Sequence, residues 1–196
     1  MKKIKVKFTF SDISRIDEKT LLLNLYLTQV LTLVVALVFF FFQKQSVLEL
    51  LKWNDFTEPF LWGSAFAALV IIADLIMDRF VPEEHLDDGG INEKIFKNRP
   101  LWHIFLLSFI VAVCEELLFR GAIQHAIGPY WTSIVFATLH VRYLRHWLLT
   151  GLIFATSYGL GWIYLQTGSL WTPIIAHFWI DFVMGCVIRY RKDEGG

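Results

Sequence analysis

Residues 101–120 read LWHIFLLSFIVAVCEELLFR, an apolar run that ends in two adjacent glutamates and, four residues after the second, an arginine. A helix needs roughly 20 apolar residues to cross about 30 Å of hydrocarbon, so residues 102–119 are predicted to span a membrane. Ionisable groups inside a span cost several kcal/mol unless they pair or line a water-filled cavity. Glu115 and Glu116 are therefore candidates for a functional role.

The rest of the chain also has the composition of a membrane protein. Its 196 residues are 56% hydrophobic with a mean hydropathy of +0.52, which is too apolar for an ordinary soluble domain of this size. The predicted fold class is all-α, a polytopic transmembrane helix bundle of about six spans. These spans are residues 21–42, 60–77, 102–119, 131–141, 147–164 and 170–188, of which the fourth is short.

The distribution of Lys and Arg predicts the orientation of the bundle. With the amino terminus inside, fifteen basic residues fall in cytoplasmic gaps, against Lys44, Lys52 and Arg120 outside. This positive-inside bias places both termini in the cytoplasm. The chain then divides into a cytoplasmic segment, two scaffold spans with a cytoplasmic loop, a core, and a cytoplasmic tail, which are residues 1–20, 21–100, 101–188 and 189–196.

The charge balance excludes one class of partner. A net charge of +0, from 18 basic and 18 acidic residues, gives no electrostatic footprint for nucleic acid. The expected partners are instead the lipid bilayer and a peptide or membrane-protein substrate. The sequence indicates no oligomeric state.

Helical spacing arranges the polar residues of the later spans. Glu116 and Arg120 are four residues apart and share a helix face, so the guanidinium can pair with that carboxylate. Glu115 points about 100° away around the helix, and its poor solvation suits it to act as a general base towards water. His177 and Asp181 also share one face.

Depth brings these residues to a common level. With a rise of about 1.5 Å per residue, Glu115 lies about 10 Å from the outer side, and His140 and His177 lie roughly 10 to 15 Å from it. Each feature has a structural alternative. The glutamates could begin an outer loop with Arg120 as a surface partner, His140 could be a hydrogen-bonded core residue, and the His177–Asp181 pair could join two helices. The shared depth favours a single site.

Three motifs follow one another on successive predicted spans: Glu115-Glu116-x-x-x-Arg120, Phe136-Ala137-Thr138-Leu139-His140 and His177-Phe178-Trp179-Ile180-Asp181. In these motifs the chain resembles the CPBP family of intramembrane proteases. This is the Abi or type II CAAX prenyl endopeptidase group, which also contains bacteriocin self-immunity proteins. The resemblance covers about residues 101–188, and the first two spans carry no motif of the family.

The resemblance implies a helical bundle with a polar cavity that admits peptide and water. By analogy, six residues would form a water-activating pair, an ordering pair and an oxyanion pair, which are Glu115 with His140, Glu116 with Arg120, and His177 with Asp181. Position 181 departs from the prenyl proteases of the group, which usually carry Asn there. An ionised Asp cannot donate a hydrogen bond, so Asp181 is either protonated or orients His177.

The implied function is an intramembrane endopeptidase that hydrolyses a peptide bond at or within the membrane. Its role would be of the CAAX type, in peptide maturation or in bacteriocin immunity. We expect a multi-pass protein of a bacterial plasma membrane. CAAX processing is cytoplasmic, whereas the depth count puts the site nearer the outer side. Either one span is miscounted or the substrate is not a prenylated cytoplasmic protein. The compact sequence suggests a bacterial member, which favours the other two roles.

Two further classes remain as alternatives. The first is a non-catalytic bacteriocin immunity or membrane-partner binding protein. The second is a proton-coupled transporter, which six short spans without repeat symmetry disfavour. No cofactor is expected, since the chain lacks HExxH. Zinc held by Glu115, His140 and His177 is the minority alternative, because Glu and His are acceptable zinc ligands.

Overall fold

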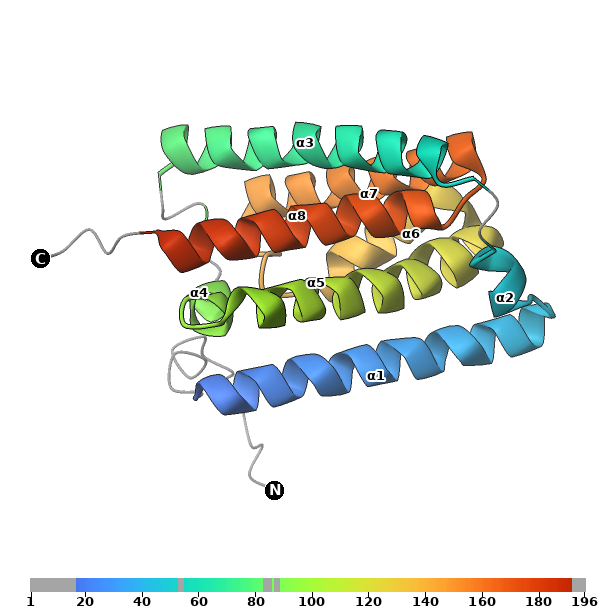
Figure 1. The fold of residues 1–196 in the computed structure, drawn as a ribbon, viewed down its shortest axis with the longest axis horizontal. Coiled ribbons are helices and arrows are strands. Elements are labelled where there is room, and N and C mark those ends of the chain that lie inside the picture. Colours follow the sequence, from blue (N-terminus) through green and yellow to red (C-terminus); the bar gives the residue numbers. More distant parts are fainter. Residues whose placement is uncertain (1–16, 53–54, 83–85, 87–88, 192–196) are drawn as a thin grey trace, which may run out of the picture.

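A computed structural model describes residues 17–52, 55–82, 86 and 89–191. Helices make up its regular structure, and the described ranges contain no strand, so the all-α prediction is confirmed. The elements are α1 (Glu18–Gln43), α2 (Val47–Leu50), α3 (Thr57–Phe80), α4 (Ile91–Phe96), α5 (Leu101–Glu116), η3 (Leu117–Ile123), α6 (Gln124–Leu139), α7 (Trp147–Thr167) and α8 (Trp171–Tyr190) (Figure 1). Most of the predicted amino-terminal segment and tail lies outside the described residues.

Five helical segments of the described chain are long and apolar enough to cross a membrane. They are α1, α3, α7, α8 and the continuous run Leu101–Leu139, which is made of α5, η3 and α6. The protein is therefore a multi-pass membrane protein. The predicted fourth span forms the second half of the 39-residue run, and the count of six stays a prediction.

The long run reverses direction at Gly128. This residue has φ 77° and ψ 170°, a backbone conformation that glycine adopts without a Cβ clash, and Pro129 follows it. Proline disfavours helical backbone in the residue before it, which reinforces the break. The rings of Phe119 and Phe136 then pack with centroids 4.7 Å apart, so the chain after Gly128 lies back along η3.

One boundary prediction is wrong. The third span was expected to end at Phe119, with Arg120 counted among the outer residues. The helix instead continues through η3, and Arg120 is 0% exposed. A paired guanidinium does not need water, so a charged residue in a span does not mark its end.

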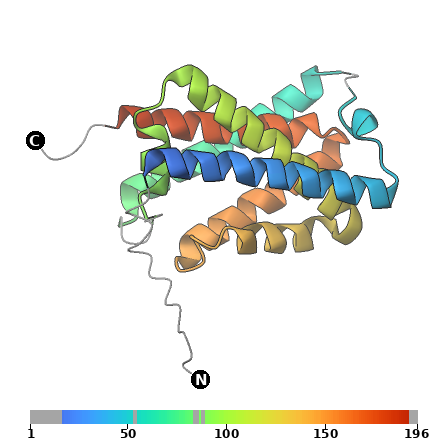
Figure 2. The ribbon, with the colours of Figure 1, turned by 90° about the horizontal axis from the view of Figure 1, so that it is seen from below.

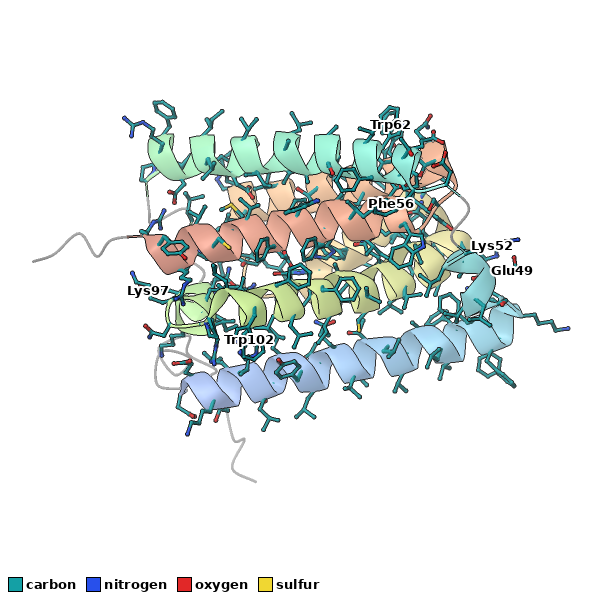
Figure 3. The ribbon with its side chains drawn as sticks, in the orientation of Figure 1. Glu49, Lys52, Phe56, Trp62, Lys97 and Trp102 are labelled. Carbon is teal, nitrogen blue, oxygen red and sulfur yellow. The ribbon has the colours of Figure 1, made fainter. Side chains whose placement is uncertain are left out.

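Ion pairs and hydrogen bonds join the helices at both ends of the bundle. At the α4 end, Arg99 Nη2 lies 2.5 Å from Glu18 Oε1, and Arg191 pairs with Asp78. At the α2 end, the Trp171 indole donates to the Leu51 carbonyl at 3.1 Å. Figure 3 shows Glu49 and Lys52 at the α2 end and Lys97 at the α4 end.

Helix α1 begins and α8 ends at the α4 end (Figure 1). The prediction that both termini lie in the cytoplasm requires them to be on the same side. Which side of the membrane this end faces stays a prediction.

Helix α1 lies on the outside of the bundle, against α4, α5 and η3 (Figures 1 and 2). The buried residues on it are Leu21, Gln29, Ala36 and Phe40. Their successive spacings of eight, seven and four residues place them on one helix face. Gln29 is the one polar residue among these four.

Candidate active site

The carboxylate of Glu116 joins two helices through a single oxygen. Its Oε1 accepts from Arg120 Nη1 at 2.8 Å and contacts His177 Nδ1 at 2.7 Å. The side chains of Glu116 and Arg120 are both fully buried, and that of His177 is 10% exposed. The Glu116–Arg120 pair expected from the spacing is present, and α8 adds a histidine to it.

Arg120 is held on three sides by acceptors and an aromatic ring. Its Nη2 donates to both the carbonyl and the hydroxyl of Ser157, at 2.9 and 3.0 Å, and its guanidinium lies 5.3 Å from the Phe136 ring centroid. Arg120 sits in η3, a π-helical segment. Such segments often occur at functional sites because they displace side chains from regular helical positions. The buried cation is thereby locked between η3, α6 and α7.

His177 lies between two carboxylates. A carboxylate can only accept a hydrogen bond, so the Nδ1 of His177 carries a proton in its contact with Glu116. On the other side of the ring, Nε2 lies 3.5 Å from Asp181 Oδ2. The Asp181 side chain is 31% exposed, so the cluster becomes more accessible from Glu116 towards Asp181.

His140 follows α6 as its C-cap and is oriented by that helix. Its Nδ1 lies 2.8 Å from the Phe136 carbonyl oxygen, which can only accept. The proton therefore sits on Nδ1, and in the neutral ring Nε2 keeps its lone pair. The imidazole packs on the Phe136 ring with centroids 4.5 Å apart. His140 is thus held in the tautomer that a proton acceptor at Nε2 requires.

Glu115 completes the cluster from the neighbouring position on α5. It is half-buried, and its Oε1 accepts from Gln29 Nε2 of α1 at 3.3 Å. It interacts electrostatically with His140, His177 and Asp181. The structure thus brings the six residues singled out from the sequence into one place. This set is called the polar cluster below, and it comprises Glu115, Glu116, Arg120, His140, His177 and Asp181.

Sequence reasoning missed three features of the polar cluster. The Glu116–His177 contact joins residues 61 positions apart, beyond the reach of helical spacing. Ser157 and Gln29 are uncharged, and uncharged polar side chains are common between membrane helices. The available signal was the presence of each inside a predicted span, and burial in the structure distinguishes them from exposed polar residues such as Thr28.

The arrangement does not match the zinc set considered above. Within the ranges that the structure describes, no three His, Cys, Asp or Glu side chains are grouped so as to hold a metal ion. Both ring nitrogens of His177 face carboxylates, and the Nδ1 of His140 faces a carbonyl. Of the proposed zinc ligands Glu115, His140 and His177, only Nε2 of His140 and the Glu115 carboxylate remain for a metal, which is short of the three protein ligands of a catalytic zinc site.

Comparisons with known proteins find relatives of this chain, and one family profile matches the part that carries the polar cluster. The family profile described as "Type II CAAX prenyl endopeptidase Rce1-like" matches residues 97–183. The Bacillus subtilis (strain 168) "Uncharacterized protein YpbD" is 42% identical over 175 residues, covering 86% of this chain and 92% of the relative. The Lactococcus lactis subsp. lactis (strain IL1403) "UPF0177 protein YxdF" is 25% identical over 169 residues, covering 81% and 94%. No solved structure matches at a significant level.

Proposed function

The chain belongs to the CPBP family of intramembrane proteases, among the type II CAAX prenyl endopeptidase Rce1-like proteins, and we propose that it hydrolyses a peptide bond through Glu115 and His140. The observation that carries this proposal is the convergence of a half-buried carboxylate and an oriented imidazole beside a fully buried Glu–Arg pair. Burial strengthens the electrostatic interactions among these groups, because the local dielectric is low.

Water activation falls to the two groups that retain free basic atoms. His140 presents Nε2, since Nδ1 is used on the Phe136 carbonyl. Glu115 presents the oxygen that Gln29 does not occupy. A water held between them loses a proton to one group as it attacks the peptide carbonyl, and that proton passes to the leaving amine.

Stabilisation of the tetrahedral oxyanion falls to His177. With Nδ1–H directed at Glu116, a second proton on Nε2 makes the ring a cation between two carboxylates. Asp181 then accepts a hydrogen bond from Nε2–H and holds the ring in one orientation until the substrate arrives. This assignment agrees with the second of the two roles considered for Asp181, orientation of His177. A donor fixed in advance in a dry cavity is worth far more than the same donor in water.

Glu116 and Arg120 act as the support of the site. Their ion pair fixes the carboxylate that positions His177, and Ser157 fixes the arginine in turn. Because both charges are fully buried, neither can bind a peptide directly. Their role is therefore to hold His177 in place while the substrate is exchanged.

The increase in exposure supports entry from the α4 end. Along α8, Asp181 is more exposed than His177 and lies one turn nearer the helix end that Arg191 follows. Under the positive-inside count that end is cytoplasmic. Gln29, which contacts Glu115, lies about 17 Å along α1 from Glu18 and about 21 Å from Gln43, near mid-depth. This geometry reconciles a deep site with a cytoplasmic substrate.

We place the protein in a bacterial plasma membrane, since both relatives named above come from bacteria. The substrate is a peptide segment that enters the bilayer, and its cleavage is of the CAAX type or serves peptide maturation or bacteriocin immunity. No metal takes part in this mechanism.

The proposal is tested with protein purified into proteoliposomes and a library of membrane-inserted peptides. Glu115→Gln and His140→Ala should each lower cleavage by at least about a hundredfold, the usual scale for a general acid–base group. Two matched controls, Asp74→Asn and His103→Ala, should keep normal cleavage. Asp74 is a half-buried carboxyl of α3, and His103 is hydrogen-bonded to Tyr26. Cleavage that survives in both Glu115→Gln and His140→Ala contradicts the proposal and favours a binding role.

A further inference from the structure

The polar cluster receives a contact from α1, which lies outside the residues that the family profile matches. Gln29 lies on α1, is 5% exposed, and donates from Nε2 to Glu115 Oε1 at 3.3 Å. The amide orientation follows from chemistry, since a carboxylate offers only acceptors and only the NH₂ group can face it. Burying an amide inside a span is costly unless it forms hydrogen bonds. The position is therefore occupied for a reason other than simple packing.

We propose that Gln29 is a positioning residue that holds the Glu115 carboxylate towards the hydrolytic water. The proposal rests on the function proposed above and extends the site to α1. Glu115 has no ion pair among the described residues, unlike Glu116 beside it, which accepts from Arg120 and His177. Gln29 thus donates the one hydrogen bond that the Glu115 side chain accepts within the described ranges. Without it, the carboxylate is free to rotate among several rotamers.

The same helix supplies a matched control. Gln43 is also a glutamine of α1, and its Nε2 donates at 3.1 Å to the carbonyl oxygen of Ala122, on the neighbouring η3. In both glutamines the buried Oε1 has no hydrogen-bond partner within the described residues. The two side chains therefore make the same kind of interhelical contact, one to the candidate base and the other to backbone. A purely structural role predicts similar effects for both.

The decisive comparison is Gln29→Met against Gln43→Met in proteoliposomes. Methionine keeps the length of the side chain and suits an apolar span, so both variants should fold. Gln29→Met is expected to lower kcat about tenfold with KM within about twofold, the scale of one hydrogen bond to a charged group. Gln43→Met should leave kcat within about twofold, whatever it does to the thermal midpoint in detergent.

A second background tests whether Gln29 acts through Glu115. Glu115→Asp withdraws the carboxylate by one methylene, beyond the reach of Gln29, so adding Gln29→Met should cost less than about twofold there. An unchanged kcat for Gln29→Met, or an equal loss in both backgrounds, overturns the positioning role and leaves the proposed function intact. Failure of the proposed function would be recognised by a different result, which is cleavage that does not depend on Glu115.

Discussion

His177 Nδ1 lies 2.7 Å from Glu116 Oε1, and this contact ties α8 to α5 at the oxygen that also receives Arg120. One carboxylate oxygen thereby fixes both the supporting cation and the histidine proposed to stabilise the oxyanion. The stability of the bundle and the geometry of its site consequently depend on the same buried group.

The first prediction concerns the buried ion pair. Arg120→Ala leaves the Glu116 carboxylate in the interior without its main partner, and the free energy of unfolding should fall by roughly 3–5 kcal/mol. Titration with a denaturing detergent in mixed micelles measures the change. Arg191→Ala is the control, because its ion pair with Asp78 is about half exposed and should contribute no more than about 1 kcal/mol. Equal losses in the two variants would contradict the account.

The second prediction concerns Asp181. If it orients His177 as an acceptor, Asp181→Asn retains an amide oxygen for Nε2–H and should keep kcat within roughly fivefold, since a neutral acceptor replaces a charged one. Asp181→Leu removes the acceptor and should cost at least about tenfold. Cleavage kinetics on one defined peptide separate the two variants. A complete loss in Asp181→Asn would show that the negative charge itself is required.

The third prediction concerns the contact between α3 and α8. A Cβ placed on Gly63 would lie 2.7 Å from the Thr172 carbonyl oxygen and 3.1 Å from Ile175 Cβ, and the backbone atom cannot move aside cheaply. Gly63→Ala should therefore cost about 1–3 kcal/mol, as for other overpacked sites. Gly151→Ala is the matched control, because no atom lies within 4 Å of its Cβ position. If both variants unfold at the same detergent fraction, the close approach of the helices is wrong.

The fourth prediction concerns metal. Because no three ligand side chains converge in the described part of the chain, a strong chelator should leave the rate of cleavage unchanged after prolonged incubation. Metal content measured on the same preparation provides an independent readout. Activity that disappears with the chelator and returns with zinc would replace the proposed mechanism with a metal-dependent one.

Much of the site could be predicted from the sequence, because ionisable residues inside a span are costly unless they pair or line a polar cavity. The i and i+4 spacing paired Glu116 with Arg120 correctly. The predicted end of the third span was wrong at the same arginine, because a hydropathy criterion places charged residues outside the membrane whether or not they are paired. The long-range contacts failed for another reason. Helical spacing describes one helix at a time, so it could not show that Gln29 and Ser157 face the cluster.

The most direct test of the central claim is single-turnover cleavage of one membrane-inserted peptide in ¹⁸O-labelled water, with wild type and Glu115→Gln compared by mass spectrometry. Wild type should yield a product with one ¹⁸O in its new carboxylate, and Glu115→Gln should yield at least about a hundredfold less in the same time. Asp74→Asn should match wild type, since this carboxyl of α3 lies outside the polar cluster. Equal labelled product from wild type and Glu115→Gln would contradict the assignment of Glu115 as the base that activates water.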